Sequence, residues 1–244
     1  MGKLAGKVAV ITGGGSGVGK ATAALFLREG AKVVIAGRDA AKLEAVAKEL
    51  KGADALRTFP TDVSKADQCE ALVAFATKAF GRVDVLVNNA GTNLKARTIR
   101  ELTPESWDTM IRTNLDGAFY CTKAVLPQML DRKDGVVVNV VSTSGKRATP
   151  LGGAAYVAAK FGMAALGLVL AAEEKDSGVR VSNVYPGEID TPILAVRPKP
   201  VSEEHRATIL KPEDVAEAVL FVAALPARVS IPELVIKPTA QMYW

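Results

Sequence analysis

Short runs of β-branched apolar residues alternate along the chain with segments in which apolar residues recur every three or four positions. The runs predict strands that are buried on both faces. They lie at residues 7–12, 32–36, 56–60, 83–87, 136–141, 179–184 and 234–237. The segments between them predict amphipathic helices. The clearest of these are residues 20–29, 40–50, 67–80 and 215–224.

Strands that alternate with helices predict a parallel sheet covered by helices on both faces. We therefore expect an α/β chain with a single-domain, doubly wound (Rossmann) fold and a seven-stranded parallel sheet. No long linker or strong internal repeat divides the 244 residues, so one domain over 1–244 is predicted. The least regular stretch, 193–211, combines prolines with charged residues, which is typical of a lid over a binding site.

Composition excludes several classes of protein. Hydrophobic residues make up 49% of the chain and charged residues 23%, which excludes disorder. The two cysteines, Cys69 and Cys121, lie in apolar helical patterns and predict reduced core residues of a cytoplasmic protein. With a single histidine, His205, a His-rich metal site is excluded, and we expect no metal.

Charge and hydropathy argue against nucleic-acid and membrane partners. The net charge of +5 is spread along the chain without a basic run, so no nucleic-acid partner is expected. We find no secretory signal and no apolar run of the length of a membrane span, so no membrane partner is expected either.

A glycine-rich loop closes the first predicted strand and opens the first helix. It runs from Thr12 to Gly19 and contains Gly13, Ser16, Gly17, Val18 and Gly19. Glycines at such a turn allow a pyrophosphate to approach the backbone, and the helix N-terminus offers free N–H groups. Because the loop is part of a βαβ unit, we interpret it as a dinucleotide site and not as a plain turn.

The end of the second predicted strand indicates which dinucleotide binds. A carboxylate there favours NAD, whereas an arginine accommodates the 2′-phosphate of NADP. Here Gly37 ends the strand and Arg38 follows it, while Asp39 is expected to cap the next helix. We therefore predict NADP(H) in preference to NAD(H); the alternative is that Arg38 is a solvated loop charge.

Tyr156 and Lys160 are four residues apart and share one face of a predicted helix. A nearby ammonium lowers the pKa of a phenol, so Tyr156 could act as general acid or base. Such a pair occurs by chance on many helices, but Ser142 follows a predicted strand upstream, where a hydroxyl could polarise a substrate carbonyl.

With these residues in place, the chain resembles the short-chain dehydrogenase/reductase family from residue 7 to about residue 237. The family's T-G-x-x-x-G-x-G, N-N-A-G, Y-x-x-x-K and P-G-x-x-x-T motifs match here in the same order. They correspond to Thr12–Gly19, to Asn88, Asn89, Ala90 and Gly91, to Tyr156 and Lys160, and to Pro186, Gly187, Ile189 and Thr191. Six expected site residues each follow the carboxyl end of one of the first six predicted strands, the edge at which open α/β sheets bind ligands. They are Gly13, Arg38, Asp62, Asn88, Ser142 and Pro186.

The resemblance implies a role for each matching residue. Tyr156 would donate or accept a proton, Lys160 would lower its pKa and bind the nicotinamide ribose, Ser142 would polarise the carbonyl, and Asn114 would hold a relay water. The cofactor would contact Asp62 and Val63 near adenine, Val18, Ile189 and Thr191 near nicotinamide, and the glycine-rich and N-N-A-G loops.

Two features depart from the family pattern. The usual spacing of thirteen residues before the tyrosine leads to Thr143, but Asn139 stands three residues before Ser142 as in the family's N-x-x-S, so we assign Ser142. The C-terminal run 231–239 lacks the common V-D-G-G and is similar to the tail of NADP-dependent 3-hydroxy acid and serine dehydrogenases. The roles of Tyr243 and Trp244 are left open.

The favoured hypothesis is therefore an oxidoreductase that moves a hydride between NADP(H) and a small carbonyl or alcohol substrate. The alternatives are a catalytically silent dinucleotide sensor or scaffold, and an epimerase or dehydratase, for which the chain offers little room. The resemblance further implies a homotetramer or homodimer. An acidic substrate could meet Arg97, Lys146, Arg147 or Arg197, although each one alone is interpreted as a solvated charge.

Overall fold

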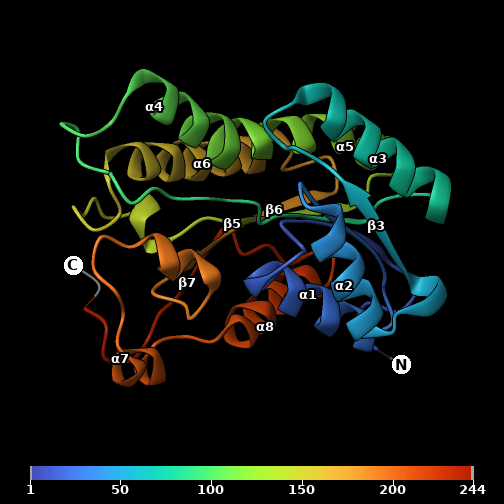
Figure 1. Cartoon of the computed structure of the whole chain (residues 1–244). Helices are drawn as coiled ribbons and strands as arrows, with labels where there is room; N and C mark the ends of the chain where they lie inside the picture. Colours follow the sequence, from blue (N-terminus) through green and yellow to red (C-terminus); the bar gives the residue numbers. More distant parts are fainter. Residues whose placement is uncertain (1, 243–244) are drawn as a thin grey trace.

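The β-branched runs form one sheet in the computed structural model, which describes residues 2–242 (Figure 1). Its strands are β1 (Val8–Thr12), β2 (Lys32–Gly37), β3 (Leu56–Pro60), β4 (Val85–Asn88), β5 (Gly135–Val140), β6 (Val179–Pro186) and β7 (Glu233–Ile236). All neighbouring strands are parallel, in the order β3-β2-β1-β4-β5-β6-β7. The predicted doubly wound fold is confirmed, and each strand lies within two residues of its predicted bounds.

Helices cover both faces of the sheet (Figure 1). They are α1 (Gly17–Arg28), α2 (Ala40–Leu50), α3 (Ala66–Phe80), α4 (Pro104–Ile111), α5 (Gly117–Arg132), α6 (Ala154–Glu173), α7 (Glu203–Thr208) and α8 (Pro212–Ala223). One apolar core lies under α1, α2 and α8, and a second under α3 and α5. Both cysteines are buried and unpaired, as predicted.

Within residues 2–242, α6 is long and apolar enough to resemble a membrane span, with a mean hydropathy of 1.7. Its buried residues, which include Met163 and Leu170, belong to clusters shared with β6. The helix also buries Lys160. It is therefore a core helix, whose buried face packs against the sheet.

A ladder of asparagines crosses the carboxyl ends of three strands. Asn88, Asn139 and Asn183 occupy paired positions on β4, β5 and β6 and are almost fully buried. Asn88 Nδ2 donates to Asn139 Oδ1 at 3.0 Å, and Asn139 Nδ2 donates to Asn183 Oδ1 at 2.9 Å. Asn183 Nδ2 then donates to the carbonyl of Ala164 on α6 at 2.8 Å. The ladder fixes the strand ends relative to the helix that carries Tyr156.

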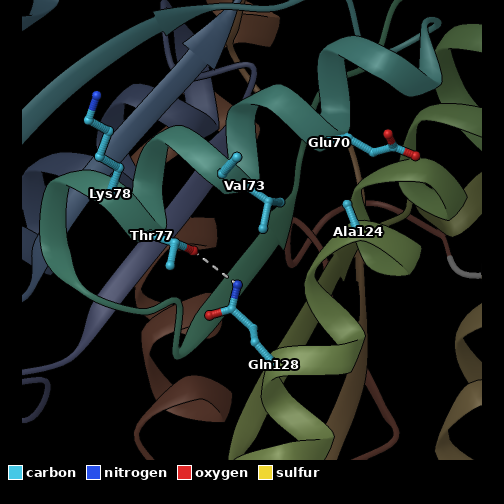
Figure 2. A pocket seen from close by; sticks show the side chains of 7 residues that line it. Glu70, Val73, Thr77, Lys78, Ala124 and Gln128 are labelled. Carbon is cyan, nitrogen blue, oxygen red and sulfur yellow. Dashed lines mark hydrogen bonds between the residues drawn. The ribbon is translucent and has the colours of Figure 1, made fainter.

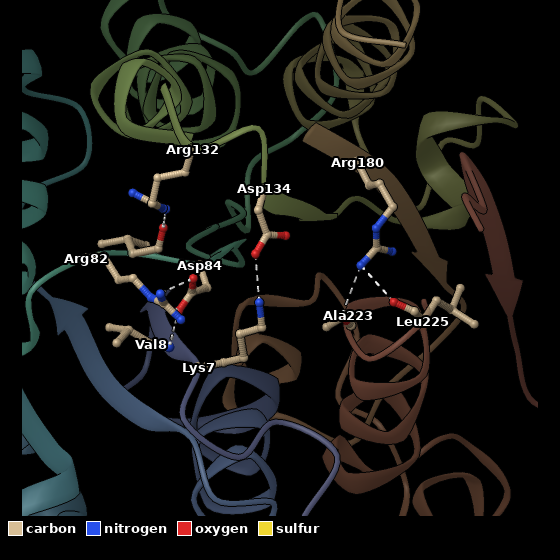
Figure 3. A network of polar contacts seen from close by, with 10 residues as sticks. Lys7, Val8, Arg82, Asp84, Arg132, Asp134, Arg180, Ala223 and Leu225 are labelled. Carbon is tan, nitrogen blue, oxygen red and sulfur yellow. Dashed lines mark hydrogen bonds and ion pairs between the residues drawn. The ribbon is translucent and has the colours of Figure 1, made fainter. Parts of the chain in front are cut away.

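The opposite edge of the sheet is held by charged side chains (Figure 3). Asp84 accepts from the N–H of Val8 at 2.8 Å and pairs with Arg82. On β6, Arg180 reaches four backbone carbonyls at the end of α8 and beyond, with Nη–O distances of 3.1–3.4 Å. This arginine satisfies carbonyls that a helix end leaves without intrahelical partners.

We expect Arg180→Met to destabilise the protein without changing the site. The variant leaves several partly buried carbonyls without donors, so its free energy of unfolding should fall by about 1–3 kcal/mol. Urea unfolding of both proteins at equal concentration measures the difference. Arg228, which is exposed beyond the same helix, provides the control variant Arg228→Met. Equal losses in the two variants would contradict the role of Arg180.

Candidate active site

A cavity of about 700 Å³ opens at the carboxyl edge of the sheet. Its walls come from the loops after β1, β2, β4, β5 and β6 and from the start of α6. Fourteen of the predicted site residues line it: Gly13, Ser16, Gly17, Val18, Arg38, Asn89, Gly91, Ser142, Tyr156, Lys160, Pro186, Gly187, Ile189 and Thr191. The volume is within the range of ordinary small-molecule sites.

The other five predicted residues are not among those that line the cavity. Gly19 is packed against the Gly13 carbonyl, which a Cβ would approach to 2.4 Å, and the N–H of Ala90 donates to Thr12 Oγ1 at 3.0 Å. Asp62 and Val63 follow β3, where Asp62 Oδ1 accepts from the N–H of Ser64. Asn114 is almost fully buried in a π-helical turn, Arg112–Asp116.

A second hollow, between α3 and α5, contains none of the predicted residues (Figure 2). Gln128 Nε2 donates to Thr77 Oγ1 at 3.2 Å across it, and Glu70 and Lys78 line its rim. The candidate chemistry is therefore gathered at the carboxyl edge of the sheet.

The glycine-rich loop forms a tight cradle. Gly13 has a φ of +69°, and a Cβ at this position would lie 2.8 Å from Asn89 Nδ2. Asn89 in turn donates to the carbonyl of Thr12 at 2.8 Å, which ties the N-N-A-G loop to the end of β1. Gly17 has a φ of +50°, and a Cβ there would lie 3.2 Å from Thr191 Cγ2. Side chains are thus excluded from the positions at which a pyrophosphate would meet backbone N–H groups, so this loop fits a dinucleotide.

Two basic residues face this loop. Arg38 is exposed on the cavity rim after β2, and Lys42 lines the cavity from the first turn of α2. Asp39 Oδ1 accepts from the N–H of Lys42 at 3.1 Å, so its predicted capping role is confirmed. Lys42 was not predicted as a site residue, although its position four residues after Arg38 indicates that the two could contact one ligand.

Ser142 and Tyr156 meet across the cavity wall. The Ser142 hydroxyl hydrogen-bonds Tyr156 and also accepts from the N–H of Ser144 at 3.0 Å. Thr143 lines the cavity too, but the contact with Tyr156 favours Ser142 as the residue that acts with the phenol. Burial raises the pKa of Tyr156, and the Ser142 hydrogen bond and the charge of Arg97 only partly offset it.

Lys160 lies one helical turn after Tyr156 and is 3% exposed. Its Nζ is 5.8 Å from the centre of the Tyr156 ring and donates to the carbonyl of Val140 at 2.9 Å. Burial lowers the pKa of Lys160 to about 7, so near neutral pH its charge is only partial. In the structure, the Ser142 hydroxyl and the charge of Arg97 lower the pKa of Tyr156 against the effect of burial. The expected lowering by Lys160 stays a prediction.

Asn114 holds the N-N-A-G loop with its side chain. Its Oδ1 accepts from the N–H of Thr92 at 3.0 Å, and its Nδ2 donates to the carbonyl of Met110 at 2.9 Å. A Cβ on Gly91 would lie 2.9 Å from Asn114 Oδ1 and 3.8 Å from Lys160 Nζ, so the three residues converge. The amide is engaged within the protein and does not line the cavity.

The segment 193–211 is more regular than predicted. It contains most of a 3₁₀ turn, Pro192–Val196, and the whole of α7. Ion pairs anchor it to the loop after β6: Arg206 with Asp190 at 2.7 Å, and Arg197 with Glu188 at 3.2 Å. His205 Nε2 also lies 2.5 Å from Glu188. These contacts join residues nine to seventeen positions apart, beyond the span of a helical or strand repeat, so local pattern did not indicate them.

The C-terminal tail completes the wall of the cavity. Its contribution was not predicted from the sequence. Gln241 and Met242 line the cavity, and Gln241 Oε1 accepts from the N–H of Glu188 at 2.9 Å. Tyr243 and Trp244, whose roles were left open, lie outside the described residues.

The interpretation of the arginines and Lys146 as solvated charges is wrong for three of the four residues. Arg97 is buried, Arg197 pairs with Glu188, and Lys146 pairs with Glu233 at 2.6 Å. Arg147 is exposed at the cavity mouth.

Fold and site together define an α/β protein with a dinucleotide cradle beside a serine, a tyrosine and a lysine. The model of the short chain dehydrogenase family matches residues 7–201, and the chain belongs to this family. It is an oxidoreductase of that family, expected from its fold to use a nicotinamide dinucleotide.

The most informative relatives agree on the class and differ in cofactor. An uncharacterized oxidoreductase of Staphylococcus aureus (strain MRSA252) is 38% identical over 96% of this chain and 98% of its own. A serine dehydrogenase solved with NADP+ is 33% identical, with a TM-score of 0.89 over 97% of this chain and 96% of its own. A 3-ketoacyl-(acyl-carrier-protein) reductase from Brucella melitensis, solved with NADH, is 35% identical, with a TM-score of 0.88 over 96% of this chain and 98% of its own.

Proposed function

We propose that this protein interconverts a small carbonyl compound and the corresponding alcohol, with NADP(H) as cofactor. The observation that carries the proposal is that Ser142, Tyr156 and Lys160 line the same cavity as the glycine cradle and Arg38. When bound, the nicotinamide supplies or accepts the hydride. The chain's contribution is to position the reactants and to move a proton.

The phenol of Tyr156 is the proton donor for reduction and the acceptor for oxidation. Ser142, which hydrogen-bonds that phenol, would polarise the substrate carbonyl. Lys160 Nζ, within reach of Tyr156 and of the Gly91 loop, would hold the ribose and stabilise the phenolate. Asn114 keeps Thr92 in place through its side chain and would hold the relay water.

Gly13, Ser16, Gly17 and Gly19 would hold the pyrophosphate, and Asn89, Ala90 and Gly91 the adjacent ribose. The adenine would lie against Asp62 and Val63. Val18, Pro186, Gly187, Ile189 and Thr191 would enclose the nicotinamide. The residues 193–211 would close over the substrate as a lid, within one catalytic domain that spans 1–244.

The test is cofactor turnover by the purified protein. NADPH and NADH are compared over ketones, aldehydes and oxo acids, and NADP+ and NAD+ over the corresponding alcohols and hydroxy acids. Turnover with NADPH well above NADH supports the proposal. Cofactor binding without turnover of any compound would favour the silent sensor or scaffold.

Replacement of Arg38 by alanine should reduce the preference for NADPH. A guanidinium on a phosphate forms charge-assisted hydrogen bonds, so affinity for NADPH should fall by about 10- to 100-fold. Affinity for NADH should stay within about threefold. Equilibrium binding by cofactor fluorescence measures both, and Lys42→Ala should show a smaller effect in the same direction.

Lys48, exposed on the last turn of α2, provides the control variant Lys48→Ala. If the wild-type protein binds NADH more tightly than NADPH, or if Arg38→Ala weakens both equally, the assignment of Arg38 to the 2′-phosphate is wrong while the role of Tyr156 stands.

We also propose a cytoplasmic homo-oligomer, either a tetramer or a dimer. Large apolar side chains are exposed on α4, α5 and α6, namely Trp107, Phe119, Phe161, Leu168 and Val169. Their burial between subunits would be a favourable contribution to association. Sedimentation of the purified protein measures the assembly.

A further inference from the structure

Arg97 is a buried cation beside the proposed proton donor. It is 6% exposed and lines the cavity. Its carbonyl accepts from the N–H of Ala154 at 3.2 Å, at the start of the helix that carries Tyr156. Its side chain packs on Gly153, where a Cβ would lie 2.6 Å from Arg97 Cβ. The guanidinium is close enough for its charge to lower the pKa of Tyr156.

The guanidinium is bound by neutral groups alone. Nη1 donates to the carbonyl of Leu151 at 2.6 Å, and Nη2 donates to the carbonyl of Val196 at 2.5 Å. Nε is buried without a hydrogen-bond partner. Among the ion pairs within residues 2–242 none involves Arg97. A buried charge is normally paired, so this position lacks an anion.

The carboxylates nearby are already engaged elsewhere. Glu101 accepts from the backbone N–H of Arg97 and from the hydroxyl of Thr98. Glu188 pairs with Arg197 and His205. Arg197, which also lines the cavity, adds positive charge and, after burial, is the main cause of the lowered pKa of Arg97. Among the described residues that line the cavity, Glu188 is the one carboxylate against several arginines and lysines, so the lining carries a net positive charge.

We propose that Arg97 binds a carboxylate of the substrate, because it lines the cavity that holds Tyr156, its buried guanidinium has no acidic partner, and its Nε makes no hydrogen bond. A guanidinium can donate two parallel hydrogen bonds to a carboxylate, and desolvation strengthens them. This assignment rests on the proposed function. It makes the substrate a short oxo acid or hydroxy acid whose reacting carbon lies a few bonds from the carboxylate.

The test compares acids with their uncharged esters. Pyruvate, 3-oxobutanoate and 4-oxopentanoate are each assayed beside the methyl ester, with NADPH, in wild type and in Arg97→Met. We expect wild type to favour at least one acid over its ester by about tenfold or more in kcat/KM. Arg97→Met should lose that preference through a rise in KM for the acid, so that the ratio of kcat/KM for the acid to kcat/KM for its ester falls by about tenfold or more.

Two further variants separate recognition from folding. Arg97→Lys keeps the charge and should recover part of the acid preference. Arg100→Met removes an exposed charge from the same loop and should leave the preference unchanged. If Arg97 only clamps Leu151 to Val196, Arg97→Met lowers acid and ester turnover equally, and the proposal is overturned.

Calorimetry of butanoate binding to the NADP+-loaded protein gives a readout without turnover. Wild type should bind butanoate, and Arg97→Met should bind it at least about tenfold more weakly. Equal binding, or none to wild type, overturns the proposal even if ketones are reduced. Arg97-dependent binding without turnover of any compound would support the carboxylate site and count against the proposed oxidoreductase activity.

Discussion

Tyr156→Phe should abolish almost all turnover while cofactor binding persists. The variant removes the proton donor but keeps the ring that lines the cavity, so kcat should fall by about 10²- to 10⁴-fold, the usual contribution of a positioned general acid or base. Steady-state rates with the best substrate, in both directions, measure the loss. Cofactor titration of the same preparation should give a dissociation constant within about threefold of wild type.

Tyr120→Phe is the matched control, because Tyr120 lies on α5 and does not line the cavity. It should retain wild-type rates. Substantial activity in Tyr156→Phe would mean that another group transfers the proton, and the proposed mechanism would be wrong.

Lys160→Met should abolish activity and at the same time stabilise the free protein at pH 7. Burial lowers the pKa of Lys160 from 10.5 to about 7. Between these values the unfolded chain binds a proton that the folded chain does not, so lysine at this position disfavours folding. The shift corresponds to at most about 5 kcal/mol at 1.36 kcal/mol per pKa unit. Loss of the hydrogen bond to Val140 offsets about 1–3 kcal/mol, which leaves a net gain of about 2–4 kcal/mol.

The difference in stability between Lys160→Met and wild type changes sign with pH. The penalty from the buried lysine is complete below pH 7, decreases as the pH rises, and disappears above 10.5, where only the lost hydrogen bond remains. Urea unfolding without cofactor, at equal protein concentration, should therefore show the variant more stable at pH 7 and no more stable near pH 10.5. The exposed Lys48→Met should show no such crossover. A variant less stable than wild type at pH 7 would contradict the argument.

The strands, the glycine-rich loop and the pairing of Tyr156 with Lys160 could all be predicted from sequence. Each depends on local physics: continuous β-branched runs favour strands buried on both faces, and a spacing of four residues places two side chains on one helical face. Because parallel strands present their carboxyl ends at one edge, the loops after them could also be assigned to one site.

The sequence alone therefore determined the fold class, the glycine-rich loop after β1 and the placement of Tyr156 and Lys160 on one helical face, since these depend on neighbours within a few residues. Only the tertiary structure brought Arg97 beside Tyr156, added Gln241 to the cavity wall and anchored α7 through Arg206 and Asp190. Whether an arginine is solvated or buried depends on what packs over it, and for Arg97 the covering carbonyls belong to Leu151 and Val196, more than fifty residues away. Long-range packing of this kind leaves no local pattern in the chain, because it requires the complete set of contacts that the sheet and its loops create.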